Sequence, residues 1–297
     1  MTDGALLLDK PLGPSSNGVL QEAKRLLGAK KAGHGGTLDP LASGLLLLLF
    51  GEATKFAGLL LDQEKEYLAS VKLGEKTATG DAEGEILERK DVTVRRPDVD
   101  AVLERFRGEI EQLPPMHSAL KRDGVPLYKL ARQGKAVERA PRRVRILELE
   151  VVSFESPRLE LRVRCSKGTY VRTLAEDIGA ALGTGAHLRG LRRTASGRFR
   201  LEDAVSLEAL RQLSPAARSA RVLPLAALVE GLPRAALDAG AEARLRNGQA
   251  LEISGLAEGV VAVVRADGAL IGLGRSEAGV LRPLRLTQAA DLASETS

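Results

Sequence analysis

A glycine-rich stretch of this chain places an imidazole and a carboxylate close together, immediately before an apolar segment. His34 and Asp39 lie within residues 33–44, whose glycines let the backbone turn sharply or approach a ligand closely. The run that follows, residues 45–50, is entirely apolar and must be buried. A polar loop held at the edge of a core is where catalytic residues often lie. From spacing alone, however, an Asp-Pro turn whose Asp caps the following element explains the stretch better.

The chemistry open to such a carboxylate is nucleophilic attack or proton removal. The stretch is not a phosphate-binding P-loop, because no Gly-Lys-Ser or Gly-Lys-Thr sequence closes it. The three histidines, His34, His117 and His187, lie too far apart in sequence to show a metal-binding spacing. The single Cys165 excludes an internal disulfide and a cysteine-rich metal site. We therefore expect an activity that needs no metal, nucleotide or redox cofactor.

The elements that must position this loop can be predicted from the spacing of apolar residues. An N-cap among residues 15–17 and Gly28 bound a helix before the loop. The strand 158–165 has the cleanest alternation, and it puts Cys165 on the apolar face, which is typical of an inert core thiol. We also expect strands over 5–8, 66–74 and 144–154, the last with a bulge near Ile146, a turn over 9–14, and helices over 53–61, 98–106 and from 169 to 182.

Arg172 lies in the first turn of the helix expected from Thr169, at the margin of the buried stripe of that helix. A cation near a helix N-terminus is slightly unfavourable with the helix dipole. The position therefore favours an arginine that is placed for a partner, although an exposed arginine is tolerated at most positions.

The composition is that of an ordinary globular protein with a basic balance. The 297 residues are enough for one large domain, or for one large and one small domain. The chain carries 44 Lys and Arg against 39 Asp and Glu, which suits a polyanionic partner if the basic residues cluster, and otherwise indicates only a solvated surface. A plausible phosphate-contacting cluster is formed by Lys121, Arg122, Lys129, Arg132, Lys135, Arg139, Arg142, Arg143 and Arg145.

The two ends of the chain suggest a soluble cytoplasmic protein with a small second unit. The first residues lack the basic region of a signal peptide, and the longest apolar run is too short to cross a bilayer. Residues 213–233 are rich in Ala and Pro and predict a linker. A hairpin with a turn at Asp267-Gly268 and a last strand over 281–286 predict a small β unit, and we expect disorder after residue 288.

Residues 34–44 (HGGTLDPLASG), followed by residues 51–55, closely resemble the signature of bacterial tRNA pseudouridine synthases of the TruB type. Residues 112–121, 165–174 and 185–194 match further segments of that family in the same order, so the resemblance covers most of residues 5–200. Two departures are visible. Gly35 stands where the family has Thr, which we expect to loosen the loop, and His117 stands where Tyr is usual.

The resemblance implies roles for individual residues. Asp39 would be the catalytic carboxylate, and Arg172 would pair with it. Tyr67 would contact the target uracil and assist proton removal at its C5 atom. The remaining substrate-binding residues implied are His34, which would replace or stack on displaced bases, Tyr170, Leu191, Lys10 and Pro11.

The family also implies a fold and a substrate. The fold would be α/β (α+β), with a mixed, mainly antiparallel sheet flanked by helices. Residues 1–231 would form the catalytic domain, 232–288 a PUA-like RNA-binding domain, and 289–297 a disordered tail. The substrate would be the T-arm of tRNA, whose uridine 55 is converted to pseudouridine. The resemblance implies a monomer that needs no cofactor, no protein partner and no membrane.

Two other functions remain open from the sequence. A tRNA-binding folding chaperone without essential catalysis would use the same basic clusters and C-terminal unit. A hydrolase with paired carboxylates is the second alternative, but the matching segments offer no credible second acid for it and no metal cluster. The path of the isomerisation, nucleophilic or through a glycal, also stays open.

Overall fold

A computed structural model of the chain describes residues 2–288, except 117, 119, 123, 128–129, 131–132 and 134–136. The expected tail 289–297 therefore lies outside the described residues. So do His117 and three members of the basic cluster, Lys129, Arg132 and Lys135.

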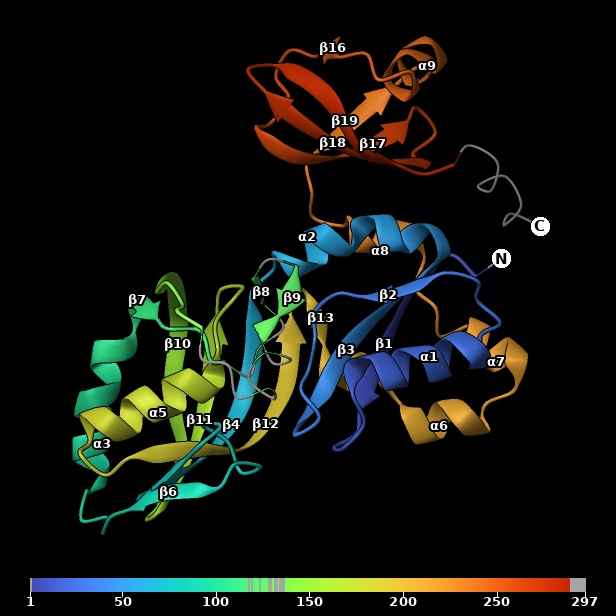
Figure 1. Ribbon diagram of the computed structural model, residues 1–297. Helices are drawn as coiled ribbons and strands as arrows, with labels where there is room; N and C mark the ends of the chain where they lie inside the picture. The colour runs from blue at the N-terminus through green and yellow to red at the C-terminus, as the bar shows by residue number, and fades with distance from the viewer. Residues whose placement is uncertain are drawn as a thin grey trace.

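In the described part of the chain, the largest unit is a 10-stranded sheet with the order β14-β1-β3-β12-β4-β11-β10-β7, in which β2 also pairs with β3 and β13 with β12 (Figure 1). The pairs β1–β14 and β3–β12 are parallel and the others are antiparallel, so the predicted mixed, mainly antiparallel sheet is confirmed. The strands are β1 (Gly4–Lys10), β2 (Ala32–His34), β3 (Ala42–Phe50), β4 (Lys65–Leu73), β7 (Gly108–Gln112), β10 (Arg142–Glu155), β11 (Arg158–Cys165), β12 (Ala186–Ser196), β13 (Phe199–Arg200) and β14 (Val205–Ser206).

The apolar run in β3 is continuous because both faces of this strand are covered. Leu45, Leu47 and Leu49 pack into one hydrophobic cluster, and the alternate residues of the strand pack into another. All of residues 45–50 are fully buried. A strand buried on both faces loses the alternation of apolar and polar residues that identifies a half-buried strand. The strand that carries the chain away from Asp39 is therefore anchored at the centre of the protein.

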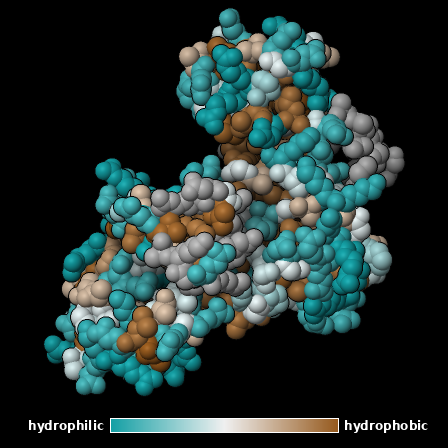
Figure 2. All heavy atoms as spheres, viewed as in Figure 1, coloured by the Kyte–Doolittle hydropathy of each residue, from teal (hydrophilic) through white to brown (hydrophobic). Residues whose placement is uncertain are grey.

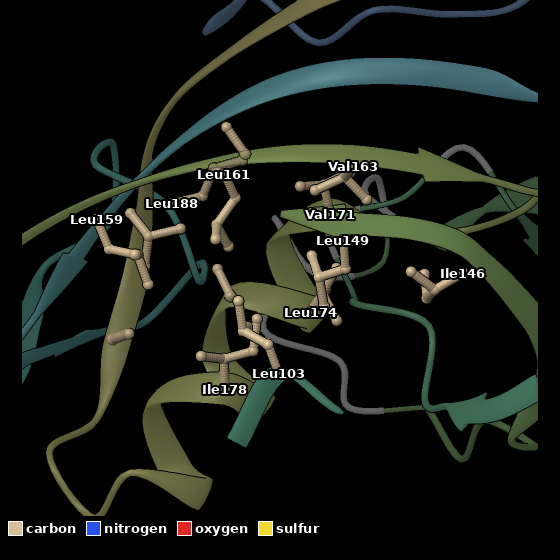
Figure 3. Packing of buried hydrophobic residues seen from close by; sticks show 14 of the residues in the cluster. Leu103, Ile146, Leu149, Leu159, Leu161, Val163, Val171, Leu174, Ile178 and Leu188 are labelled. Carbon is tan, nitrogen blue, oxygen red and sulfur yellow. The ribbon is translucent and has the colours of Figure 1, made fainter. Parts of the chain in front are cut away.

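Helices cover the sheet in three groups (Figure 1). One group, α3 and α5, packs on the half of the sheet that contains β4, β10 and β11, through residues such as Leu103, Leu174 and Ile178 (Figure 3). A second group, α1 and α6, packs on one face of β1 and β3, and a third group, η1, α2 and α8, packs on the other face. The helices of this large unit are α1 (Ser16–Leu26), η1 (Gly51–Phe56), α2 (Ala57–Leu61), α3 (Arg96–Leu103), η2 (Glu104–Phe106), α5 (Val171–Ala181), η3 (Leu201–Asp203), α6 (Leu207–Gln212), α7 (Pro215–Ser219) and α8 (Leu225–Leu228), where η marks a 3₁₀ helix.

Most predicted elements are present, and the differences have local causes. Ser15 is the N-cap of α1, and the register of β10 shifts between Ile146 and Glu148, as predicted. The expected helix 53–61 is divided into η1 and α2 at Phe56, whose φ of −94° and ψ of 1° lie outside the α-helical region. The first strand continues to Lys10, so the expected turn begins only at Pro11.

The C-terminal unit has a second sheet with the order β15-β17-β18-β19-β16 and one helix, α9, among the residues described there. Its hairpin turns at Asp267-Gly268 as predicted. Residues of this unit pack with η1, α2 and α8 in one cluster, and Figure 2 shows hydrophobic atoms on the side that meets them. The elements are β15 (Arg234–Leu237), α9 (Ala239–Arg246), β16 (Leu251–Glu252), β17 (Gly259–Arg265), β18 (Leu270–Glu277) and β19 (Val280–Leu286).

Two small hairpins complete the described structure: β5 (Glu75–Thr77) with β6 (Ile86–Arg89), and β8 (Lys121–Arg122) with β9 (Val125–Pro126). No helix within the described ranges has the length and the apolar character to cross a membrane.

Candidate active site

The loop between β2 and β3, the start of α5, and the strands β4 and β12 enclose a cavity of about 330 Å³. This size falls within the range of small-molecule sites, about 300–1,000 Å³. Five of the residues assigned from the sequence line this cavity: Asp39, Tyr67, Tyr170, Arg172 and Leu191. The fold thus brings together side chains that are spread over most of the large unit.

The backbone around Asp39 is fixed from α1 and from the turn before it. The buried hydroxyl of Ser16, the first residue of α1, donates to the carbonyl oxygen of Leu38 at 2.7 Å and accepts from the Leu38 N–H at 2.8 Å. The N–H of Gly13 donates to the carbonyl oxygen of Pro40 at 2.9 Å. Since the backbone is hydrogen-bonded on both sides of Asp39, the position of the Asp39 Cα atom is fixed.

Arg172 connects two carboxylates. Its Nη2 donates to Asp39 Oδ2 at 2.9 Å, and its Nη1 donates to Asp81 Oδ2 at 3.0 Å. The side chains of Arg172 and Asp81 are buried, whereas that of Asp39 is 49% exposed. A planar guanidinium suits this arrangement because each arm has a fixed direction. The cation in the first turn of α5 is therefore explained by its two anionic partners.

Asp81 is itself held by the loop after β5. Its Oδ1 accepts from the Thr79 hydroxyl at 2.5 Å and from the Glu83 N–H at 3.1 Å, which leaves Oδ2 for Arg172. The second carboxylate that the sequence did not reveal is thus present. Because both of its oxygens are occupied, it serves as an anchor for Arg172 and does not act as the second acid of a hydrolase.

The backbone N–H and carbonyl of Tyr170 are both hydrogen-bonded to a side chain of β7, at the edge of the sheet. Gln112 in β7 is buried, and its side-chain amide donates to the Tyr170 carbonyl at 3.3 Å while its oxygen accepts from the Tyr170 N–H at 3.0 Å. Tyr170 is the N-cap residue of α5 and offers no side-chain cap of its own. Burial raises the pKa of the Tyr170 hydroxyl, so this hydroxyl is protonated near neutral pH.

Tyr67 in β4 and Leu191 in β12 form the floor of the cavity. Leu191 pairs with Ala42 of β3 on one side and Ala69 of β4 on the other, so it sits between the carboxylate loop and β4. Burial raises the pKa of the Tyr67 hydroxyl, against an opposing effect of the nearby Arg193. Both side chains come from the middle of a rigid sheet, which suits residues that position a base.

Lys65 also lines the cavity, but its ammonium is hydrogen-bonded to backbone carbonyl oxygens of the protein. The Nζ donates to the carbonyl oxygens of Leu60, Leu61 and Gln63 at 3.1, 2.7 and 2.6 Å. Burial lowers its pKa to about 8. These bonds satisfy the carbonyls at the exit of α2, so the role visible here is a helix C-cap.

Three residues assigned from the sequence do not line the cavity: His34, Lys10 and Pro11. His34 is half-buried in β2, and burial and then Arg193 lower the pKa of its imidazole, which favours the neutral ring. Its Nδ1 has no hydrogen-bond partner among the described residues.

Lys10 differs most from the expectation of a substrate contact. Its side chain is fully buried, and its Nζ donates to the carbonyl oxygens of Pro11 and Pro14 at 2.9 and 2.7 Å. The ammonium therefore holds the turn 11–14 and does not face solvent. Pro11 is exposed on that turn.

Gly35 does not loosen the loop, contrary to the expectation. It is buried, and its N–H donates to the Leu47 carbonyl oxygen at 2.9 Å. A Cβ at this position would lie 3.1 Å from the Cβ of Leu60. The space that a side chain would need is thus occupied by α2, which explains why glycine fits here.

Four residues that position the site were not identified from the sequence: Ser16, Asp81, Gln112 and Arg193. Asp81 lies in a polar loop rich in Thr, Asp and Gly, and Ser16 is one of the three capping candidates before the first helix; neither pattern indicates a role in the site. A buried polar residue can be recognised as a positioning residue only when its hydrogen-bond partner is known. These partners lie far away in the sequence, so the sequence alone does not show them.

Comparison with protein families gives three matches in chain order. Residues 24–171 match the TruB family pseudouridylate synthase N-terminal domain. Residues 172–231 match the tRNA pseudouridylate synthase B C-terminal domain, and residues 233–287 match the C-terminal domain of pseudouridine synthase II TruB.

Similar proteins and structures extend over nearly the whole chain. A tRNA pseudouridine synthase B of Burkholderia mallei (strain NCTC 10247) is 55% identical over 291 residues, which cover 96% of each chain. One of Azoarcus sp. (strain BH72) is 54% identical and covers 96% of this chain and 95% of the relative. A chain of a Cbf5-Nop10-Gar1 complex has a TM-score of 0.72 at 31% identity, over 93% of this chain and 78% of that one. A chain of an H/ACA RNP bound to a substrate RNA containing 2'-deoxyuridine has a TM-score of 0.69 at 29% identity, over 93% and 78%. Sequence identity of this extent, together with a carboxylate and an arginine paired in a shared cavity, shows that the chain belongs to the TruB family of pseudouridylate synthases.

Proposed function

We propose that this enzyme, a tRNA pseudouridine synthase by its family, isomerises uridine 55 in the T-arm of tRNA, with Asp39 as the catalytic residue. One observation carries this proposal most directly. The Asp39 carboxylate is the exposed end of a buried Arg172–Asp81 network and lies in a cavity lined by two tyrosines. Attack on a bound nucleotide requires a carboxylate whose orientation the protein fixes and which the substrate can reach.

The substrate must enter this cavity as an extracted nucleotide. A uridine stacked within a folded RNA loop cannot enter this cavity, so the enzyme has to turn the base out of its stack. Tyr67, Tyr170 and Leu191 offer aromatic and apolar surface that can replace the lost stacking. This set of contacts accounts for binding of a planar base beside Asp39.

The reaction exchanges one bond between the base and the sugar for another. The N1–C1′ bond breaks, the uracil turns while it stays bound, and C5 bonds to C1′. Asp39 can open this sequence in two ways: its oxygen attacks C1′, or it takes the C2′ proton towards a glycal. Both use the same carboxylate, and Arg172 orients it in both.

The isomerisation ends with loss of the proton from C5 and protonation of N1. We propose that the Tyr67 oxygen takes the C5 proton, because this side chain lines the same cavity as Asp39. Since burial raises the pKa of Tyr67, the hydroxyl form predominates near neutral pH. Tyr67 must therefore release its own proton when it takes up the one from C5, and N1 of the uracil, which gains a proton at this stage, receives it.

Contacts with the rest of the RNA are proposed from the surroundings of the cavity. The neutral ring of His34 can stack on a base displaced by the extraction. Arg142, Arg143 and Arg145 of β10 are exposed and can face phosphates. The C-terminal unit, residues 232–288, would act as a PUA-like RNA-binding domain, and its closeness in sequence to TruB C-terminal domains supports this role.

The test is release of tritium from a T-arm RNA labelled at C5 of its uridine 55. The wild-type protein should release the label. Asp39→Asn should release almost none while its RNA affinity stays within a few-fold of the wild type. The matched control is Asp100→Asn, because Asp100 is an exposed residue of α3 paired only with Arg96, and it should release the label at the wild-type rate. Tight RNA binding without release by the wild type would contradict the proposal and favour a chaperone that only binds tRNA.

A further inference from the structure

Arg193 is the largest fully buried side chain in the described part of the chain. No carboxylate pairs with it among those residues. Its guanidinium donates instead to three backbone carbonyl oxygens, those of Leu45 at 2.7 Å, Gly36 at 3.2 Å and Thr37 at 3.5 Å. Burying a charge is costly unless it is fully hydrogen-bonded, so such a residue needs a reason.

The three carbonyls lie on both sides of the catalytic loop. Gly36 and Thr37 precede Asp39, and Leu45 follows it in β3. One guanidinium therefore ties the entry and the exit of the loop together. The backbone of β12 comes close enough for this only because position 44 is glycine, since a Cβ at Gly44 would lie 2.3 Å from the Arg193 carbonyl oxygen.

Arg193 also faces Tyr67. The two residues are register partners in the antiparallel pair of β12 and β4, and both line the cavity that contains Asp39. Since side chains of register partners lie on the same face of a sheet, the Arg193 guanidinium and the Tyr67 ring meet next to the Asp39 loop.

We propose that Arg193 is a positioning residue that ties the two ends of the Asp39 loop together and places its positive charge beside Tyr67. This inference deepens the proposed function, and it rests on that function only for the use of Tyr67 in the reaction. The charge of Arg193 also favours the ionised form of Tyr67, against the effect of burial. Lysine cannot replace it, because a single ammonium cannot span carbonyls on both sides of the loop.

The first experiment needs no RNA, so it tests the inference even if the proposed function fails. The chain has no Trp and three Tyr, namely Tyr67, Tyr128 and Tyr170. In a background with Tyr128→Phe and Tyr170→Phe, the near-ultraviolet absorbance of phenolate reports the titration of Tyr67 alone. Arg193→Gln should move the midpoint to higher pH, and Arg193→Lys should move it less because the charge is kept. Circular dichroism at each pH confirms that the protein is folded.

The matched control is Arg192→Gln on the same strand. Arg192 donates to Asp9 at 2.8 Å and to Ser43 at 3.3 Å, away from the cavity, and its removal should leave the Tyr67 midpoint in place. An unchanged midpoint in folded Arg193→Gln, or an equal shift in Arg192→Gln, would overturn the inference.

The second experiment covers the case in which Arg193→Gln does not fold, since glutamine is too short to reach all three carbonyls and leaves buried ones without a donor. Arg193→Lys is then compared with the wild type over the pH range of the tritium-release reaction. A positioning role predicts a kcat lower by about tenfold or more with a KM changed less than kcat, and a pH profile of kcat displaced to higher pH. A purely structural role would lower the folded fraction without displacing the pH profile. A wild-type kcat with an undisplaced profile would contradict the inference.

Discussion

Arg172 and Asp39 form an ion pair of 2.9 Å whose two members lie in unlike surroundings, because the arginine side chain is 8% exposed and the carboxylate 49%. A buried cation thus holds an exposed anion at the edge of the cavity. The second arm of the guanidinium is fixed by Asp81, which is more buried still. The direction of the Asp39 carboxylate is therefore set within the protein before any RNA arrives.

Replacement of Arg172 by lysine should be severe although the charge is kept. A lysine ammonium is a point charge and cannot reach Asp39 and Asp81 with two arms of fixed direction. We expect kcat for tritium release to fall by about 100-fold, since small displacements of a reacting group have effects of this order. The matched control is Arg164→Lys, because Arg164 also bridges two carboxylates, Glu64 and Glu148, but on the surface. Wild-type kcat in Arg172→Lys would show that the two-armed contact is not needed.

Asp81→Asn should affect both stability and turnover. The asparagine keeps the shape but leaves the buried Arg172 with one anionic partner, and breaking a buried pair costs about 3–5 kcal/mol. We expect a lower midpoint of urea unfolding, a kcat reduced together with it, and an RNA affinity close to that of the wild type. Normal stability combined with normal turnover would mean that Asp81 does not anchor Arg172.

Ser16→Ala should destabilise the loop that carries Asp39. The variant removes both hydrogen bonds to Leu38 and leaves two buried backbone groups unsatisfied, at about 1–3 kcal/mol. The neighbouring Ser15→Ala is the control, because it removes only the exposed N-cap of α1, at about 1 kcal/mol. Denaturant unfolding and tritium release should separate them: both variants lose stability, but only Ser16→Ala loses kcat. Equal kcat in the two variants would remove Ser16 from the positioning network.

The stability of the folded protein should depend on Lys10 at alkaline pH. Burial, opposed by Asp39, lowers the pKa of Lys10 from 10.5 to about 8. Between these values the unfolded chain binds a proton that the folded chain has lost, so the contribution of Lys10 to stability rises as the pH increases from about 8 and is level below it.

The measurement is the urea midpoint of the wild type and of Lys10→Met at several pH values. Lys65, whose pKa is also about 8, acts in the same direction, and Cys165, whose pKa burial raises to about 11, acts in the opposite one. Both are present in the two proteins, so the difference between the midpoints isolates Lys10. This difference should change in favour of the wild type from pH 8 upward. A constant difference would show that Lys10 keeps its proton in the folded protein over this range.

The sequence predicted elements well where one face of an element is buried. The alternation in residues 158–165 and the helical stripe after Thr169 are present as β11 and α5. It did not predict β12, although this strand lies at the centre of the sheet. The reason is physical: β12 is rich in arginine, and the burial of Arg193 depends on carbonyls supplied by a loop far away in the sequence.

The same limit applies to the site. The resemblance to a family identified Asp39 and Arg172, and the structure places them side by side; their catalytic roles stay predictions. Lys10 shows the reverse case, since a basic residue in a turn beside the site suggests a phosphate contact, yet its ammonium is enclosed by carbonyls. A list of residues gives chemical types, and only the packing decides which atoms face the substrate.

The parallel pairing of β3 with β12 has a consequence for how the protein is made. During synthesis β3 leaves the ribosome long before its partner β12. The separation in sequence between β1 and its partner β14 is larger still. Contacts between segments so distant in sequence form late, because a long loop must close first. The nascent chain therefore holds Asp39 without the strand that completes its cavity. Such a chain lacks Leu191 and Arg193 in its cavity, so we expect activity to begin only after β12 has been translated.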